Sequence, residues 1–401
     1  MPEPFAAVKI SEHVYWVGAI DWSIRDFHGY LTGRGSTYNA YLILSDPVTL
    51  VDTVKAPFRE EMLSRIASVV EPGKIRQLIS NHSEMDHSGS LPEMIQLLRP
   101  EKVFASVMGA RTLQEHFHLD QEIIPLKDGE SLNLGKLKLT FLETRMLHWP
   151  DSMVTYLHDD ALLFSQDGFG MHLASSERFA DEIPAEILSW EAARYFANIL
   201  LLYSSLILKL LERVGKLNLP IKIIAPDHGP IYRKNLDWIL QSYARWAAQK
   251  PSRQAVVVYD TMWQSTEKMA RAIGEGLAAG GAGVKLLSLK SCHRSDVATE
   301  ILGAGALLVG SPTLNNGLFP TVADCLSYLK GLRPQNLSGA AFGSYGWSGE
   351  SVGEIEGILK EMKINLLSEG LKVKYVPDRE ALERCFSLGK LVAEKMAEKT
   401  K

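Results

Sequence analysis

Four side chains that can bind a metal ion lie within six consecutive residues of the stretch ISNHSEMDHSGS, 79–90. They are two imidazoles and two carboxylates: His82, Glu84, Asp86 and His87. A regular strand or helix cannot direct all four toward one point, because its side chains alternate between faces or spread around an axis. The apolar run IRQLIS before them is typical of a buried strand, and the Ser-Gly-Ser after them can start a helix. The pattern therefore predicts a strand-to-helix loop that turns these side chains inward around a metal.

Three further candidates are expected at strand ends elsewhere in the sequence. His148 lies within ETRMLHWPDS, Asp167 within ALLFSQDG after the run ALLFSQ, and His228 within IKIIAPDHGP after the run IKIIAP. A lone histidine is usually an ordinary surface or core residue, and a lone Asp before Gly usually forms a turn. We give that ordinary reading to the scattered histidines His13, His116, His118, His158, His172 and His293. Seven candidates in this arrangement, in contrast, predict a metal site.

The ligand types indicate which metal. Four imidazoles and three carboxylates without a thiolate are not typical of a structural zinc site. Three carboxylates would offset three of the four positive charges of two divalent ions, and a bridging hydroxide the fourth. Mixed histidine and carboxylate ligation suits non-haem iron. Asp167 is the natural bridge, since one carboxylate can offer an oxygen to each ion.

This set of residues resembles the metallo-β-lactamase superfamily, an αββα sandwich. Hydrolytic members usually have His where this chain has Glu84, and the replacement is the mark of the flavodiiron proteins. The phrases DWSIRDFHGY and GSTYNAYLI also resemble that family. The resemblance implies two irons: one held by His82, Glu84 and His148, the other by Asp86, His87 and His228, with Asp167 shared. In some members the residue at the position of His87 is not bound to iron, so its ligation stays open.

The pattern of predicted strands and helices changes near AAQKPSRQ, 247–254. This change and the length of the chain predict two domains, 1–250 and 251–401. The first part begins with short strands separated by turns. The second alternates strands and helices: strands at AVVVYD, GVKLLSL, ALLVGSPT, GAAFGSYG and LKVKYV are separated mostly by helical stretches. This α/β alternation predicts a doubly wound parallel sheet.

Three loops of the second part follow predicted strands at their carboxyl ends, where ligands bind in open α/β sheets. The first runs directly into a helix, so its hydroxyls and free backbone N–H groups could cradle a phosphate. The loops resemble those that hold FMN in flavodoxin, although flavodoxins usually carry Gly where Trp263 stands. The residues expected to contact FMN are Thr261, Met262, Trp263, Gln264, Ser265, Thr266, Pro312, Thr313, Leu314, Asn315, Asn316, Gly317, Ser344, Tyr345, Gly346, Trp347, Ser348 and Gly349. Tyr345 and Trp347 offer flat surfaces for the isoalloxazine ring.

The two halves together imply a flavodiiron oxidoreductase that reduces O2 to water, NO to N2O, or both. Two Fe(II) and one reduced FMN would store the four electrons that O2 reduction needs, and two electrons would couple two NO. By the same resemblance, His28 and Tyr195 are candidate catalytic residues beside the irons. The alternative is a metallo-hydrolase with a redox-regulatory flavodoxin domain, which Glu84 argues against. A scaffold with a vestigial site is a third reading, which the complete ligand set argues against.

Composition and sequence pattern limit the partners and the cellular compartment that we expect for this protein. The 401 residues are 46% hydrophobic and 22% charged with a formal net charge of −4, which does not favour nucleic acid as a partner. The start lacks a signal-peptide pattern, and we expect the apolar run at 197–214 to be a buried helix, so neither a membrane span nor export is predicted. Cys292, Cys325 and Cys385 form no C-x-x-C pair, which fits a cytoplasmic protein. Electrons would then come from an external donor: a rubredoxin, a deazaflavin or a flavoprotein reductase. We also expect a head-to-tail homodimer, alone or as a dimer of dimers.

Overall fold

The computed structural model describes residues 4–399, and the chain forms two compact units. The first unit is Met1–Tyr195 with Ser205–Ala244, and the second is Phe196–Ser204 with Arg245–Lys401. This division falls a few residues before the predicted boundary at 250/251 and adds 196–204 to the second unit. The boundary at 250/251 itself stays a prediction. One consequence is that the chain passes between the units three times.

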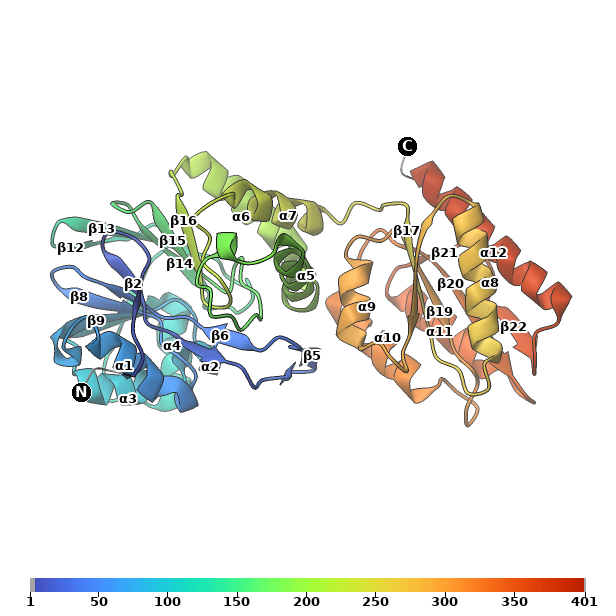
Figure 1. Ribbon diagram of the computed structural model, residues 1–401, viewed down its shortest axis with the longest axis horizontal. Coiled ribbons are helices and arrows are strands. Elements are labelled where there is room, and N and C mark those ends of the chain that lie inside the picture. Colours follow the sequence, from blue (N-terminus) through green and yellow to red (C-terminus); the bar gives the residue numbers. More distant parts are fainter. Residues whose placement is uncertain (1–3, 400–401) are drawn as a thin grey trace. The chain divides into compact units, whose positions relative to one another are not determined.

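The first unit contains two larger β-sheets (Figure 1). The seven-stranded sheet has the order β1-β2-β7-β8-β9-β10-β11, from Val8–Lys9, Val14–Trp16, Tyr41–Ile43, Val48–Val51, Ile75–Ser80, Lys102–Ser106 and Ile123–Leu126. The five-stranded sheet has the order β12-β13-β14-β15-β16, from Ser131–Leu134, Leu137–Glu143, Met153–Leu157, Leu162–Gln166 and Ile223–Pro226. Two short antiparallel pairs are formed by β3 (Ala19–Asp21) with β6 (Ser36–Tyr38) and by β4 (Asp26–Phe27) with β5 (Tyr30–Leu31).

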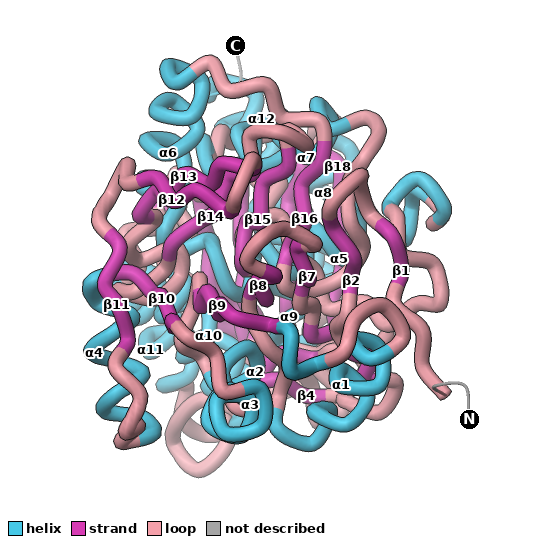
Figure 2. The backbone as a smooth tube through the Cα atoms, turned by 90° about the vertical axis from the view of Figure 1, so that its left-hand side faces the viewer, coloured by secondary structure: helices cyan, strands magenta, loops and turns pink. Residues whose placement is uncertain are grey.

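The two sheets pack face to face and helices cover the outside, so the predicted αββα sandwich is confirmed. One core cluster joins Tyr41 and Ile79 of the larger sheet to Phe141 and Phe164 of the smaller one. A second cluster joins the opposite face of the larger sheet to helices α1 (Arg59–Ala67), α3 (Leu91–Leu98) and α4 (Val107–Phe117), as Figure 2 shows from the side of this unit. Alternating strand residues thus serve different cores, as the period of two requires.

The apolar run at 197–214 is not the buried helix that we expected. After α5 (Ala185–Tyr195) it forms a π-helical turn at Phe196–Leu200, a 3-10 turn at Leu201–Tyr203, and then α6 (Ser204–Leu217). Beyond Ser204, Ile207 is the one fully buried residue of α6. By length and composition alone, Ala185–Leu217 could cross a membrane, and 44% of its most apolar window is buried in the protein. This is weak evidence for a span, since core helices of soluble proteins pass the same test.

The second unit is a parallel sheet with helices on both faces, so the predicted doubly wound sheet is also confirmed. Its strand order is β18-β17-β19-β20-β21, with β22 also paired to β20. The strands are β17 Gln254–Tyr259, β18 Gly283–Ser288, β19 Ala306–Gly310, β20 Ser338–Tyr345, β21 Asn365–Leu366 and β22 Leu371–Lys374. The helices are α8 Ser265–Ala279, α9 Arg294–Ile301, α10 Pro320–Leu332, α11 Glu350–Glu361 and α12 Arg379–Lys399. The fifth strand position is thus shared by two short strands.

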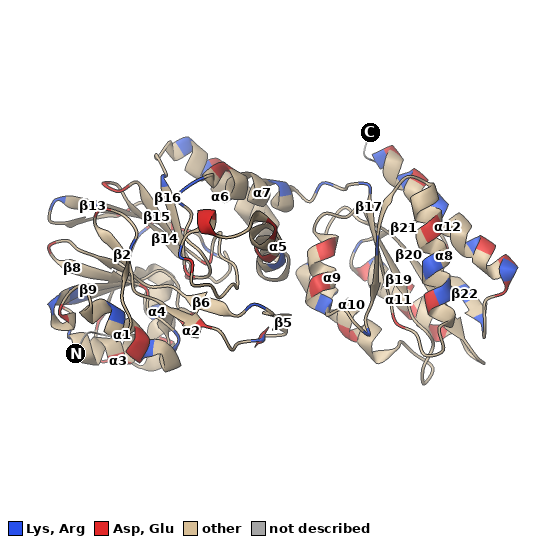
Figure 3. Ribbon diagram, viewed as in Figure 1, with Lys and Arg blue, Asp and Glu red and all other residues tan. Residues whose placement is uncertain are grey.

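Successive residues of β17 point to opposite faces of this sheet. Val257 packs in the cluster of α8 and α12, whereas Val256 and Val258 pack in the cluster of α9, α10 and α11. Figure 3 shows that Lys, Arg, Asp and Glu alternate along the outer surfaces of α8 and α12, while the strands between the helix layers carry few charges. Apolar side chains therefore fill both helix-sheet interfaces, and charged side chains face solvent.

Helices α8 and α12 cross so closely that glycine is needed at the contact. A Cβ at Gly276 would lie 2.0 Å from the backbone oxygen of Phe386, and one at Gly389 would lie 2.1 Å from that of Ile273. We predict that Gly276→Ala forces the helices apart and lowers the free energy of unfolding of this unit by about 1–3 kcal/mol.

The control is Gly274→Ala in the same helix, where the added Cβ meets its nearest atom at 3.8 Å. It should raise the stability by about 0.5–1 kcal/mol, because alanine favours helix over glycine. Urea unfolding of both variants measures the difference, and equal effects would show that the helix crossing does not require Gly276.

Candidate functional site

The metal-binding candidates gather where strands of both sheets end. Strand β9 of the larger sheet runs into His82, and strands β15 and β16 of the smaller sheet run into Asp167 and His228. His148 instead lies in the loop between β13 and β14, so the expectation of a preceding strand end is wrong for it. The site is thus assembled by segments from both sheets, which only the packed sandwich brings together.

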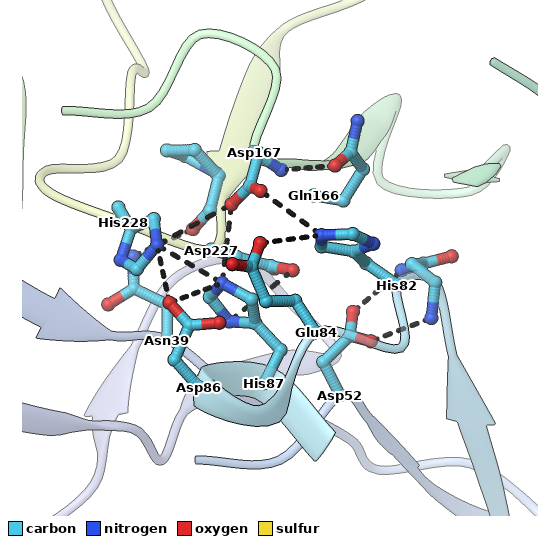
Figure 4. A network of polar contacts seen from close by, with 12 residues as sticks. Asn39, Asp52, His82, Glu84, Asp86, His87, Gln166, Asp167, Asp227 and His228 are labelled. Atoms are coloured by element: carbon cyan, nitrogen blue, oxygen red, sulfur yellow. Dashed lines mark hydrogen bonds and ion pairs between the residues drawn. The ribbon is translucent and has the colours of Figure 1, made fainter. Parts of the chain in front are cut away.

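The segment 82–87 is not a loop throughout, because its second half forms the one-turn helix α2, Met85–Ser88. Hydrogen bonds fix this turn: Thr53 Oγ1 donates to the carbonyl oxygen of His87 at 2.6 Å, and Ser88 Oγ donates to that of Ser83 at 2.7 Å. Figure 4 shows Asp86 and His87 rising from the turn toward Asp167. The extended half supplies the remaining pair, so a change of backbone conformation lets six residues offer four side chains.

The candidates form two groups that meet at Asp167. The first group is His82, Glu84, His148 and Asp167, and the second is Asp86, His87 and His228; in each, one ligand atom per residue lies within 4.8 Å of the others. Asp167 Oδ2 lies 3.0 Å from His148 Nε2 and 3.4 Å from His82 Nε2. Asp167 Oδ1 lies 3.2 Å from His87 Nε2 and 3.5 Å from His228 Nε2. The two oxygens of one carboxylate therefore face different groups, as a carboxylate shared by two ions requires.

The donor set fits cations. Both carboxylate oxygens of Asp86 are buried and make no hydrogen bond within the described residues 4–399. Asp86 Oδ2 nevertheless lies 3.2 Å from His228 Nε2 and 3.4 Å from His87 Nε2. Burying a carboxylate without donors is costly, and a cation at this point would satisfy it. The absence of sulfur ligands from both groups and the mixture of imidazole and carboxylate suit iron.

Histidines and carboxylates of the site hold one another in their charged forms. Burial tends to lower the pKa of His87, but the charges of Asp86 and Asp167 outweigh it and raise that pKa to about 10. Burial is likewise outweighed at His148, where Asp167 and Glu84 raise the pKa to about 9. Burial tends to raise the pKa of Asp167, yet the same histidines hold it well below its usual range. A metal ion must therefore displace histidine protons to bind here.

Further polar groups, one from the backbone and one from a side chain, orient the ligand imidazoles, and the sequence did not reveal them. His228 Nδ1 lies 2.6 Å from the carbonyl oxygen of Thr37, and its N–H at that position leaves Nε2 for a metal. His82 Nδ1 lies 3.6 Å from Asp151 Oδ1, while Asp151 Oδ2 accepts the backbone N–H of Ser83 at 2.7 Å. Neither Thr37 nor Asp151 stands near its partner in the sequence, so no local spacing marks them.

The side-chain amide of Gln166 links the backbone next to His148 to the backbone of Asp167. Its side-chain N–H donates to the carbonyl oxygen of Leu147 at 2.5 Å, and its side-chain oxygen accepts the backbone N–H of Asp167 at 2.7 Å. The same amide therefore touches the residue before His148 and the residue that faces it. This arrangement explains how a long loop can present His148 at a fixed position.

The two candidate catalytic residues lie at different depths. The side chain of His28 is 78% exposed, and its Nε2 lies 3.8 Å from Glu84 Oε1, so it stands at the edge of the first group. Tyr195 is buried, with its ring 6.1 Å from that of His228 and 5.2 Å from that of His172. His172, to which we gave an ordinary reading, is buried with its ring 4.6 Å from that of His228. Nothing in its sequence spacing indicated this position.

A cavity of about 740 Å³ lies at the carboxyl ends of the strands of the second unit. Its walls are Met262, Trp263, Ser265, Pro312, Thr313, Leu314, Asn315, Asn316, Ser344, Tyr345, Gly346, Trp347, Ser348, Tyr375 and Val376. The three predicted loops supply all of these except Tyr375 and Val376, which follow β22. The predicted residues that do not line it are Thr261, Gln264, Thr266, Gly317 and Gly349.

The first loop offers a fitting end for a phosphate. Helix α8 begins at Ser265 without a side-chain cap among the described residues, so its first N–H groups are available. Thr261 Oγ1 is buried and has no hydrogen-bond partner in the part of the chain that the structure describes. Trp263 and Trp347, each 88% exposed, stand at the cavity and can cover a flat ring.

Comparisons with known proteins agree with both sites. A family model described as an ODP family beta lactamase matches residues 37–229, and a flavodoxin model matches residues 257–389. The chain is 48% identical over 395 residues to a nitric oxide reductase of Moorella thermoacetica, covering 98% of this chain and 99% of the relative. It is 46% identical over 391 residues to a rubredoxin-oxygen oxidoreductase of Megalodesulfovibrio gigas, covering 96% and 97%.

Solved structures show the same likeness along the whole chain. The rubredoxin oxygen:oxidoreductase of Desulfovibrio gigas matches with a TM-score of 0.96 at 46% identity, covering 98% of this chain and 99% of that one. The flavodiiron protein of Giardia intestinalis matches with a TM-score of 0.96 at 34% identity, covering 100% and 98%.

Asp167→Ala should cost more bound metal than removal of any single histidine, because both groups lose a ligand at once. Asp167→Asn is the matched variant: it keeps the volume but loses the charge that balances the cations. We expect metal content, measured by atomic emission after dialysis, to fall for both, and furthest for Asp167→Ala. An Asp167→Ala variant with two metal ions per chain would show that Asp167 does not bridge.

Metal affinity should rise with pH. The pKa values of about 10 for His87 and about 9 for His148 mean that both imidazoles are protonated at neutral pH before metal binds. Metal binds the neutral form, so binding releases protons, and affinity should increase about tenfold per pH unit for each proton displaced. Fe(II) competition with a chelator between pH 6.5 and 8.5, under anaerobic conditions, measures the slope. A slope of zero would contradict the prediction.

Proposed function

The chain belongs to the flavodiiron protein family, and from this we propose that it reduces O2 to water, NO to N2O, or both, with electrons delivered through FMN. FMN and a non-haem di-iron centre are its cofactors. The observation that carries the proposal is Asp167, whose two oxygens face two separate groups of imidazole and carboxylate ligands.

Side chains around the cofactors would bind, shield and supply protons. When bound, the irons and the flavin provide the gas-binding and electron-transfer chemistry that protein side chains lack. Burial, and next the charge of Asp167, raises the pKa of Tyr195 well above its usual value, so its hydroxyl keeps its proton and can donate a hydrogen bond. His28, exposed and with its Nε2 3.8 Å from Glu84 Oε1, can donate or accept a hydrogen bond at the edge of the site.

One residue, Glu84, argues against the hydrolase alternative. Hydrolytic relatives usually have histidine where this chain has Glu84, whose Oε2 lies 3.2 Å from His82 Nε2 and 3.1 Å from His148 Nε2. A carboxylate in this place adds an anionic oxygen ligand that suits iron more than a nitrogen-rich zinc site. Glu84 therefore favours an oxidoreductase.

The electron donor is proposed to be a separate protein or cofactor. The sequence has three cysteines and no C-x-x-C pair, so it offers no rubredoxin-like iron site of its own. The relative named rubredoxin-oxygen oxidoreductase, at 46% identity, favours a rubredoxin over a deazaflavin or a flavoprotein reductase. Three scattered cysteines without a C-x-x-C pair fit a reducing compartment, and we propose the cytoplasm.

We further propose a head-to-tail homodimer in which the FMN of one chain serves the irons of the other. Exposed apolar side chains occur near the metal ligands, at Met85 and Met146, and beside the flavin cavity, at Trp347, Tyr375 and Val376. Such patches mark interaction surfaces in soluble proteins. A twofold axis would place the exposed apolar side chains near the metal ligands of one chain against those beside the flavin cavity of its partner. The same operation would cover the second metal site and the second flavin cavity.

Mixing the reduced protein with O2 and, separately, with NO in a stopped-flow spectrometer tests the proposed activity. Flavin reoxidation should occur within the catalytic turnover time with at least one gas, and the ratio of the two rates gives the preference. Metal analysis of the same sample should give two irons per chain. Two zinc ions and no gas-dependent reoxidation would support the hydrolase instead.

Complementation tests transfer between chains. One chain carries His148→Ala with Asp167→Ala, and the other has its FMN loop disabled at Thr261 and Ser265. A mixed dimer isolated by two different affinity tags should recover up to half of the wild-type activity, from its one intact pair of sites. If the verified mixed dimer is as inactive as either parent, the transfer does not cross between chains.

A further inference from the structure

Asp227 is a fully buried carboxylate outside the predicted ligand set. Its backbone is fixed on both sides: its N–H donates to the carbonyl oxygen of Gln166 at 2.9 Å, and its own carbonyl oxygen accepts the N–H of Asn39 at 2.7 Å. Its side chain is 0% exposed, and neither carboxylate oxygen has a hydrogen-bond partner in residues 4–399. Buried polar atoms are rarely left this way, so the position calls for a partner.

His87 offers the matching unpaired atom. Its Nδ1 is buried and makes no hydrogen bond with any described residue, and it lies 3.8 Å from Asp227 Oδ2. Its other nitrogen, Nε2, faces the site, 3.2 Å from Asp167 Oδ1. A movement of about 1 Å would bring Nδ1 and the carboxylate oxygen to hydrogen-bond distance. Figure 4 shows Asp227 behind the ring of His87, on the side away from Asp86.

The other ligand imidazoles show what such a partner does. His228 Nδ1 lies 2.6 Å from a carbonyl oxygen, and His82 Nδ1 lies 3.6 Å from Asp151 Oδ1. Metal-binding histidines usually donate their second ring N–H to an oxygen, which fixes both tautomer and orientation. Asp151 also accepts the N–H of Ser83, whereas the side chain of Asp227 makes no hydrogen bond within residues 4–399 and lies 3.8 Å from His87 Nδ1. The carboxylate of Asp227 is therefore available to the ring of His87; one of its oxygens also lies within 4.8 Å of an Asp167 oxygen.

We propose that Asp227 is a positioning residue that makes His87 a direct ligand of the second iron. An oxygen of Asp227 accepts the Nδ1–H of His87, so the unprotonated Nε2 points at the ion. A carboxyl group offers an acceptor oxygen whether it is charged or neutral, so the proposal does not depend on its protonation. It rests on the di-iron site proposed above, and it answers whether His87 binds iron in this chain.

The test is a double-mutant cycle on the full-length protein, with Co(II) as the probe and a chelator as competitor. Asp227→Ala and His87→Ala should each weaken the binding of one of the two ions by about 10–100-fold. The double variant should lose no more than the larger single loss, because the first residue acts through the second. Losses that add in the double variant, or wild-type binding of both ions by Asp227→Ala, would overturn the proposal.

Asp227→Asn provides a second reading if the alanine variant does not fold. It keeps the volume and an acceptor oxygen, so its Co(II) absorption spectrum should match that of the wild type. A spectrum that matches His87→Ala would overturn the proposal. FMN content and thermal unfolding, measured on every variant, report whether the fold is intact in each unit.

The matched control is Asp151→Ala, which removes the corresponding carboxylate behind His82. It should alter the ion of the first group, and its spectrum should differ from that of Asp227→Ala; identical spectra would overturn the assignment of Asp227 to His87. Gas reduction is not part of the readout. A wild-type chain that binds two ions but reduces neither gas would therefore contradict the proposed function while leaving this cycle interpretable.

Discussion

Mutual neutralisation of buried charges is the constraint on which the first unit depends. Seven ionisable side chains converge at a point where water has little access, and they are tolerable there because imidazoles and carboxylates alternate around Asp167. Asp167 interacts with four histidines at 3.0–3.5 Å, two through each oxygen. Removing one member leaves uncompensated charge in a low-dielectric place, which is costly. Two divalent cations would take the place of the histidine protons and offset the same carboxylates.

The sandwich is the device that holds these charges in position. Strand β9 of the larger sheet and strands β15 and β16 of the smaller sheet end at the same edge, so ligands far apart in the chain meet there. A layer of further contacts then sets the direction of each ring: Thr37 at His228, Gln166 beside His148, and carboxylates behind His82 and His87. The sheets pack through apolar faces, and close packing makes this core rigid. The ligands at the strand ends are therefore held in fixed positions relative to one another.

The second unit also places its polar binding residues at the ends of strands, outside an apolar core. Its strands bury both faces, so its polar chemistry is confined to the loops at their carboxyl ends. These loops form the cavity, and the start of α8, which has no side-chain cap among the described residues, leaves N–H donors that a phosphate could use. Close packing of α8 on α12 at Gly276 and Gly389 stiffens the helix whose N-terminus faces that cavity. A flavin site and a metal site thus occupy the ends of strands in two independent cores.

Fold class, family and cofactors could be predicted from the sequence alone, because they depend on local patterns. The segment 82–87 shows four ligand types in six residues, and the strand-helix alternation after residue 250 has a clear period. Both patterns consist of residues that are close together in the sequence, so they can be recognised without knowing the tertiary structure. The doubly wound sheet followed from that alternation, whereas the αββα sandwich and the oxidoreductase assignment followed from the family resemblance that the ligand residues carry; all three are supported by the relatives.

Other features depended on contacts between distant residues, and no local signal predicted them. The composition of the run at 197–214 predicts a buried helix, yet most of α6 is not buried, because burial depends on what packs against a helix and not on its composition alone. His172 and Asp227 look like ordinary residues in sequence, and only folding places one against His228 and the other behind His87. Residue types and spacing determined which atoms could bind a metal. The packing of two sheets determined which imidazole faces which carboxylate, since ring orientation is set by partners from other strands and loops.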